Sequence, residues 1–165
     1  MLDAKIEAAL NKQINHEITA AYHYLAMAAW CEHESLTGFA SWMKLQRQEE
    51  LKHAQRFFDY LNDRGGTVAL QPIEAPKGKF KSPKDVFLRA FELEQINTKA
   101  IYDLYQLALD LKDFATQSML KWFIDEQVEE EKTAREIEDL LELAADNKSA
   151  LLLLNRQLGE RTAAE

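Results

Sequence analysis

The feature that most constrains this chain is the length of its stretches without a helix-breaking residue. Its 165 residues include only five glycines and three prolines, so most of the sequence can run as long helices. Within these stretches, apolar residues recur at spacings of three and four, which is the period of an amphipathic α-helix. The sequence therefore predicts an all-α protein with a small number of long helices.

Start and stop signals divide the chain into four long helices and one short one. Their expected ranges are 3–34, 36–64, 82–112, 114–145 and 150–160. The second helix is expected to stop at Gly65 and Gly66, because glycine readily ends a helix. The third begins with Ser82 as its N-cap and Pro83 in its first turn, an arrangement that favours helix initiation.

The connection between the second and third helices, TVALQPIEAPKGKFK, is much longer than the other two and shows no helical period. Four helices joined in the order short, long, short form two helical hairpins linked by a crossover. We expect this crossover to make the first and third helices parallel. The predicted fold is a single domain over residues 1–165, a four-helix bundle with one long crossover and a short fifth helix at the C-terminus.

Each long helix carries an acid inside its apolar stripe. The apolar residues expected on the stripes are Ile6, Leu10, Ile14, Ala21, Tyr24, Leu25, Ala28, Met43, Leu51, Ala54, Phe57, Phe58, Phe87, Phe91, Ile101, Leu120, Phe123, Ala134, Ile137 and Leu141. The acids that interrupt them are Glu17, Glu50, Glu94 and Glu130. A leucine would be expected at each of these positions in an ordinary bundle.

The polar interruptions repeat at a fixed interval. Glu17 and Glu50 are 33 residues apart, and so are Glu94 and Gln127. In the second helix His53 follows three residues after the acid, and in the fourth helix another acid follows three residues after the glutamine. Residues three apart on a helix lie on nearly the same face. The two hairpins therefore look like structural repeats that bring their polar residues to one place.

Buried carboxylates need either a proton or a compensating charge. Burying four of them without compensation would cost roughly several kcal/mol for each carboxylate. Protonation through a raised pKa is one solution, and binding of divalent cations is the other. Four carboxylates and one imidazole suit two divalent ions bridged by Glu50 or Glu130, and this ligand set favours iron or manganese. A solvated helix face could explain any single acid, but the joint pattern favours a metal pair.

At these residues the chain resembles the bacterial non-haem ferritins over essentially its whole length. The segments that carry the resemblance are NKQINHEITAAYHYLAMAAW, QEELKHAQRFFDYLNDRGG, LEQINTKAIYDL and WFIDEQVEEEK. The resemblance implies a ferritin-like bundle that acts as an iron-storage subunit with ferroxidase activity. It also implies a homo-oligomeric hollow shell of 24 subunits, in which Fe(II) is oxidised to Fe(III) by dioxygen or hydrogen peroxide and stored as ferric mineral.

The same resemblance implies a di-iron site. One iron would be held by Glu17, Glu50 and His53, and the second by Glu50, Glu94 and Glu130. Gln127 would hydrogen-bond within the site without carrying charge, and Tyr24 would lie just behind the ligands. A third iron position toward the inner cavity would use Glu49, Glu126, Glu129 and Glu130.

Related families are distinguished by a few positions. Bacterioferritin carries haem on a methionine beside its histidine motif, but this chain has Leu51 there, so no haem is expected. Bacterioferritin also has a second E-x-x-H motif, which is replaced here by Gln127 and Glu130. Rubrerythrin-like peroxidases carry a cysteine-rich iron domain, which the single Cys31 excludes. DNA-binding mini-ferritins place the site between subunits, and they lack the long fourth helix followed by a fifth.

A catalytically silent bundle is the alternative from a different class. Animal light-chain ferritins have lost the paired site and keep only acids that nucleate mineral, but this chain keeps the full ligand set. His16, His23 and His33 are expected to be ordinary surface or boundary histidines, and Trp122 is expected to pack rather than to donate electrons. Cys31 is expected to be a small buried residue.

Charge and composition bear on partners and location. Asp and Glu total 28 against 20 Lys and Arg, for a net charge of −8, which argues against nucleic acid as a partner. The longest apolar run, SALLLL, is too short to span a membrane. The N-terminal residues MLDAKIEAALNK contain no apolar signal-peptide core. A cytoplasmic protein without membrane contact is therefore expected.

Overall fold

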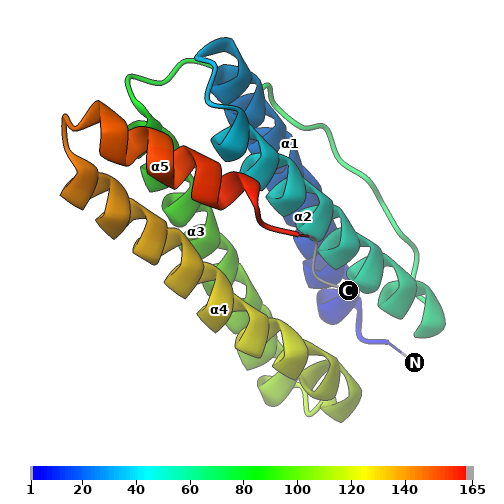
Figure 1. Cartoon of the computed structure of the whole chain (residues 1–165). Helices are drawn as coiled ribbons and strands as arrows, with labels where there is room; N and C mark the ends of the chain where they lie inside the picture. Colours follow the sequence, from blue (N-terminus) through cyan, green and yellow to red (C-terminus); the bar gives the residue numbers. More distant parts are fainter. Residues whose placement is uncertain (1, 163–165) are drawn as a thin grey trace.

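Five α-helices make up the computed structural model, which describes residues 2–162 (Figure 1). They are α1 (Ala4–His33), α2 (Thr37–Asp63), α3 (Pro83–Asp110), α4 (Phe114–Ala144) and α5 (Lys148–Gly159). No strand occurs within the described residues. The predicted bounds agree with these to within two residues at every end, so the predicted all-α fold is confirmed. None of the helices described is both long and apolar enough to cross a membrane.

Side-chain caps determine where several helices begin. The Asp3 carboxylate accepts a hydrogen bond from the Lys5 backbone N–H at the start of α1. Ser82 does the same for the backbone N–H of Asp85 at the start of α3, with Pro83 as the first helical residue. These caps satisfy N–H groups that have no partner within the helix, which explains why the helix starts could be predicted closely.

The helices pack as two hairpins, α1 with α2 and α3 with α4, and α1 also contacts α3. Helix α5 lies across the bundle and packs on α2 and α4 (Figure 1). The crossover after α2 returns along the length of the bundle before α3 begins (Figure 1). The predicted four-helix bundle with one long crossover and a short fifth helix is therefore confirmed.

The direction of the helices differs from the prediction in one respect. Along α1 the contacts with α3 run in reverse order, because Gln13 bonds to Asn97 whereas Tyr24, further along α1, bonds to Glu94. Helices α1 and α3 are therefore antiparallel, and the expectation that they are parallel was wrong. A turn reverses the chain between α1 and α2, and the full-length crossover then restores the direction of α2, so α3 is parallel to α2 (Figure 1).

Two apolar clusters fill the bundle, one on each side of a polar layer. The cluster nearer α5 includes Tyr24, Phe39, Trp42, Phe87, Ile137 and Leu154. The cluster at the opposite end includes Ile6, Leu10, Phe57, Ile101, Leu120 and Phe123. These apolar clusters supply most of the buried surface that stabilises the bundle, and they leave the middle of its length to polar side chains.

A few residues predicted for the stripes lie outside the core. Leu25, Leu51 and Phe58 are 41%, 39% and 39% exposed, and Phe91 is only partly buried. Each lies at the margin of its stripe, where a spacing of three or four still fits although the side chain points away from the bundle axis. The prediction that they face the core was wrong, whereas the burial of Cys31 is confirmed.

Candidate metal centre

The polar layer consists of the residues that interrupt the apolar stripes. Glu17, Glu50, Glu94, Gln127 and Glu130 are all between 0% and 7% exposed. They come from all four long helices. A solvated helix face therefore does not explain these acids. Their burial requires protons, hydrogen bonds or bound cations as compensation.

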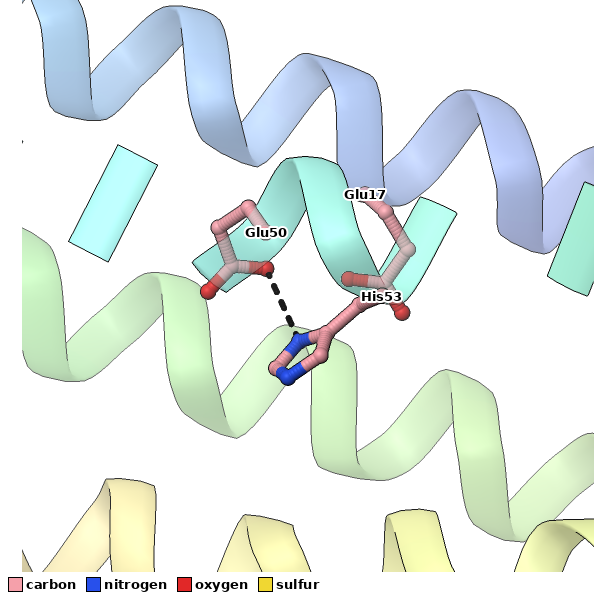
Figure 2. A group of neighbouring side chains, drawn as sticks. All are labelled: Glu17, Glu50 and His53. Carbon is pink, nitrogen blue, oxygen red and sulfur yellow. Dashed lines mark ion pairs between the residues drawn. The ribbon is translucent and has the colours of Figure 1, made fainter. Parts of the chain in front are cut away.

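Two of these acids converge with His53 where α1 meets α2. Glu17, Glu50 and His53 each offer one ligand atom, and these atoms lie within 4.8 Å of one another. Figure 2 shows the two carboxylates and the imidazole pointing toward one another, with His53 Nδ1 3.7 Å from a carboxylate oxygen of Glu50. Within the described part of the chain, neither oxygen of Glu50 nor Nδ1 of His53 has a hydrogen-bond partner. Unpartnered buried acceptors of this kind suit a divalent cation.

Aromatic side chains of α4 hold the His53 ring. Its centre lies 5.5 Å from the centre of the Trp122 ring and 5.8 Å from that of Phe123, both in edge-on geometry. Phe123 in turn stacks on Phe57 at 4.0 Å, and the guanidinium of Arg56 lies 4.1 Å from the centre of the Trp122 ring. The imidazole is thus packed into place by α4, and the contact fits the packing role expected for Trp122.

Two buried amides orient the Glu17 carboxylate, and the sequence reasoning missed both. Gln13 Nε2 donates to Glu17 Oε1 at 2.7 Å and to Asn97 Oδ1 at 2.7 Å. Asn97 Nδ2 donates to the other carboxylate oxygen at 3.1 Å. A signal was present, because Gln13 lies four residues before Glu17 and Gln46 lies four residues before Glu50. The 33-residue repeat therefore extends to the glutamines that support the acids.

The Glu94 carboxylate is held by hydrogen bonds. The Tyr24 hydroxyl donates to Glu94 Oε1, and Gln127 Nε2 lies 3.4 Å from Oε2. Gln127 also donates to the Thr98 hydroxyl at 3.1 Å and to the backbone carbonyl of Glu94 at 3.2 Å. Tyr24 and Gln127 therefore both hydrogen-bond to Glu94, a pairing that the sequence did not predict.

A side chain of α2 hydrogen-bonds to Glu130. Gln46 Nε2 donates to Glu130 Oε2 at 2.8 Å. Glu130 also forms a group with His53 and Glu126, in which one ligand atom of each lies within 4.8 Å of the others. His53 therefore belongs to both groups of potential ligands.

The four acids expected for a third iron are only partly brought together. Glu126 lies beside Glu130, but Glu49 is paired with Arg161 through an N–O distance of 2.7 Å, and Glu129 is exposed. Among residues 2–162, no group of three converging ligands includes Glu49 or Glu129. The assignment of Glu49, Glu126, Glu129 and Glu130 to one ion stays a prediction.

Burial raises the pKa values of the acids in this layer. The pKa of Glu50 lies well above its usual range because of burial and the charges of Glu94, Glu17 and Glu130. Burial also raises the pKa of Glu94 to about 7, although the Tyr24 hydrogen bond opposes the rise. For Glu130, burial and the charge of Glu94 raise the pKa to about 8. The metal-free centre therefore retains protons near neutral pH, and a divalent cation would displace them.

A surface groove reaches the centre between α2 and α4. It has a volume of about 620 Å³, and its lining includes His53, Glu49, Arg56, Trp122 and Glu126. Because His53 belongs to both groups of potential ligands, an ion in this groove would lie beside the buried acids. The groove therefore reaches the edge of the candidate metal centre at His53.

The remaining histidines and the cysteine take no part in this centre. His16 and His23 are half-buried, and burial lowers the pKa of each. His33 is exposed. None of the three joins a group of converging ligands within residues 2–162. Burial raises the pKa of Cys31 to about 12, so its thiol stays protonated and unreactive.

Comparisons with known proteins agree with this architecture. The model of the ferritin-like domain family matches residues 7–144. A bacterial non-heme ferritin of Staphylococcus aureus (strain USA300) is 42% identical over 162 residues, which cover 98% of both chains. A bacterial non-heme ferritin of Staphylococcus epidermidis is 43% identical over the same share of both chains.

Solved structures of ferritins are also similar to this chain. A humanized archaeal ferritin superposes with a TM-score of 0.98 at 42% identity and covers 100% of both chains. An open-pore ferritin from the hyperthermophilic archaeon Archaeoglobus fulgidus superposes with a TM-score of 0.97 at 43% identity, covering 98% of this chain and 100% of that one. At this level of identity and coverage, the similarity extends to the whole chain, including α5.

Proposed function

Since the chain belongs to the ferritin family, we propose that it is an iron-storage subunit with ferroxidase activity, which oxidises Fe(II) to Fe(III) with dioxygen at a di-iron site. The observation that carries this proposal is that the Glu50 oxygens and His53 Nδ1, inside a buried layer of acids, have no hydrogen-bond partner among the described residues. A bundle without a metal function would gain stability by replacing such groups with apolar ones. Their retention is explained if cations bind there.

The first Fe(II) is held by Glu17, Glu50 and His53, whose ligand atoms already converge. The second is held by Glu50, Glu94 and Glu130. We assign the bridging role to Glu50, because both of its oxygens lack partners within the described residues, whereas Gln46 engages one oxygen of Glu130. The residue pattern alone left Glu50 and Glu130 open as bridges, and the family resemblance implied Glu50.

The ligand set also favours the oxidised product. Carboxylate oxygens are hard anionic ligands, and they stabilise Fe(III) more than Fe(II) because the higher charge interacts more strongly with them. Tyr24 and Gln127 hold Glu94 in place during this change of charge. Leu51 offers no sulfur ligand, so the proposal includes no haem.

The exposed apolar surface supports assembly into a shell. Leu143, Phe114, Leu153 and Leu152 are 82%, 74%, 68% and 62% exposed, and large exposed apolar side chains commonly mark interfaces. We propose a homo-oligomer, the 24-subunit hollow shell of the family, in the cytoplasm. Ferric mineral would collect inside it, and Glu49, Glu126, Glu129 and Glu130 would hold a third iron on the way to the cavity.

A rapid-mixing experiment tests this function. Metal-free protein is loaded with about two Fe(II) per subunit without oxygen, and the absorbance of Fe(III) is followed after addition of dioxygen. We expect a fast phase that Zn(II) suppresses by competing for the same ligands. Oxidation no faster than in buffer would instead indicate a catalytically silent bundle. Electron microscopy of the iron-loaded protein would reveal whether mineral-filled shells form.

A further inference from the structure

Just beyond the end of α5, the side chain of Arg161 reaches back to the buried polar layer. One nitrogen of its guanidinium donates to Glu49 Oε2 at 2.7 Å, and the other donates to the side-chain oxygen of Gln46. The guanidinium carbon also lies 5.0 Å from the centre of the Trp42 ring. The side chains of Arg161 and Glu49 are only 26% and 12% exposed. This ion pair is largely withdrawn from water, so solvent screens it less than a surface pair.

Close packing between α5 and α2 places Arg161 there. A β-carbon on Gly38 would lie 1.7 Å from the backbone oxygen of Asn155, so only glycine permits this approach. The Asn155 side chain also accepts a hydrogen bond from the Phe39 backbone N–H at 3.0 Å. The backbone of α5 is therefore locked against the first turn of α2. Arg161 follows just after this helix, so the docking of α5 fixes its position.

Gln46 connects Arg161 to the second metal position. This glutamine is fully buried, its oxygen accepts from Arg161, and its nitrogen donates to Glu130 at 2.8 Å. The arginine charge thus acts on Glu49 directly and on Glu130 through one side chain. These are two of the four acids assigned to the third iron.

We propose that Arg161 is a built-in counter-cation of the third iron position, and that an ion binds there fully only when the guanidinium leaves Glu49. The inference rests on the proposed function, because it concerns the ion that leaves the di-iron pair. Arg161 acts here as a positioning residue that contacts Glu49 and Gln46 and not the reacting pair. It pairs with Glu49 and, through Gln46, orients Glu130 while the third position is empty.

Competition between Arg161 and the third ion for Glu49 has two consequences. Whatever free energy Arg161 contributes by pairing with Glu49 must be lost when an ion takes its place, so the arginine weakens binding of the third ion. Linkage is reciprocal, so the third ion must also loosen the end of α5. A divalent ion brings two charges where the guanidinium brings one, and it therefore displaces the arginine once its concentration is high enough.

Binding calorimetry with Fe(II) under anaerobic conditions tests the first consequence. In Arg161→Gln we expect the affinity for the third Fe(II) to rise by about tenfold, the effect of losing one charge-assisted hydrogen bond that competes with the ion. The first two binding events should stay as in the wild type. The matched control is Arg156→Gln, because Arg156 also lies on α5 but is 81% exposed, and its one ion pair among the described residues is with Glu160. Arg161→Lys keeps the charge and should stay near the wild type.

An unchanged or weaker third binding event in Arg161→Gln would overturn the inference. This outcome is distinct from failure of the proposed function, which would appear as absence of the first two binding events in the wild type.

Hydrogen exchange on the wild type tests the second consequence without any substitution. Exchange of the peptide that spans α5 is measured by mass spectrometry at two Fe(II) concentrations, one that fills the pair and one that also fills the third position. We expect faster exchange near Gly159 only at the higher concentration. Equal or slower exchange at the higher concentration would show that the third ion binds without moving Arg161, and would overturn the proposal.

Discussion

The two hairpins contribute to the metal centre in different ways, although the same 33-residue interval runs through both. The α1–α2 hairpin supplies Glu17, Glu50 and His53, which converge with several acceptor atoms unpartnered within the described residues. The α3–α4 hairpin supplies Glu94 and Glu130, which accept hydrogen bonds from Tyr24, Gln127 and Gln46. In the first half only Glu17 accepts hydrogen bonds, from Gln13 and Asn97, whereas in the second half both acids accept them.

This difference predicts an order of metal binding. Within the described residues, an ion entering the first half meets no hydrogen bond at the Glu50 oxygens or at His53 Nδ1, and it competes only with the two amides that bond to Glu17. An ion entering the second half must weaken hydrogen bonds at both of its acids, Glu94 and Glu130. The first position should therefore bind Fe(II) more tightly than the second, and the following predictions test this comparison.

The largest effect is expected from His53→Ala. His53 is the one imidazole among the proposed ligands of the pair, and it converges with Glu17 and Glu50, so its loss should remove the nitrogen ligand of the first half. We expect the fast phase of Fe(II) oxidation to fall by about two orders of magnitude or more. Rapid-mixing absorbance measures the rate.

The control for this variant is His33→Ala, because His33 is an exposed histidine in the last turn of α1. Circular dichroism should show unchanged helix content in both variants. If His53→Ala oxidises Fe(II) at the normal initial rate, His53 is not a ligand of the pair.

A smaller but more discriminating effect is expected from comparing Glu17→Gln with Glu94→Gln. Glutamine keeps the volume and removes one charge, so each variant weakens one half of the centre. Glu17→Gln should weaken binding of the first Fe(II) by about 10- to 100-fold, whereas Glu94→Gln should weaken mainly the second. Anaerobic calorimetry separates the two events. Equal effects of both variants on the first event would contradict the order of binding.

The sequence predicted the fold closely because local signals determine most of it. Ser82, Pro83 and the paired glycines after α2 mark helix ends through backbone geometry, which depends on few neighbours. The relative direction of α1 and α3 was predicted wrongly, because it depends on how far the crossover travels and not on its length in residues.

The metal centre was predictable to the extent that it repeats along the chain. Glu17, Glu50 and His53 interrupt apolar stripes, and a stripe defines one face of a helix. The pairing of Glu49 with Arg161 joins residues 112 positions apart and depends on how α5 docks, for which the sequence offers no periodic signal. Long-range packing therefore accounts for most of what the sequence did not reveal.

Stability of the metal-free protein should fall as pH rises. In the folded state the pKa values of Glu94 and Glu130 are about 7 and about 8, above the ordinary value of 4.5. Between pH 4.5 and about 8 the folded state therefore binds more protons than the unfolded state. The stabilisation is complete below pH 4.5 and is lost as pH rises to about 8, by about 3 kcal/mol for Glu94 alone. Thermal unfolding from pH 5 to 8.5 measures the trend.

Metal binding should reverse this dependence, because ligands must lose their protons to bind an ion. With saturating Zn(II), the unfolding temperature should rise with pH over the same range. Glu94→Gln should flatten the metal-free trend, because its side chain has no proton to lose. A metal-free protein that becomes more stable between pH 5 and 8 would show that the buried acids are ionised, which would remove the basis for the comparison.

The smallest effect is expected from Tyr24→Phe, which makes the second half of the centre more like the first. Phenylalanine fits the same fully buried site and removes only the hydroxyl that donates to Glu94. Because that hydrogen bond holds the pKa of Glu94 down, its loss makes the carboxyl group harder to deprotonate but leaves one oxygen free for an ion.

The two effects are separated by pH. At pH 6.5, where Glu94 must lose a proton before it binds the ion, the second Fe(II) should bind about threefold more weakly than in the wild type. At pH 8.5, where Glu94 is already ionised, the affinity should equal or exceed that of the wild type. Calorimetry at the two pH values therefore separates the two roles of the hydroxyl, and a pH-independent loss would mean that Tyr24 supports the second ion in some way other than through the Glu94 proton.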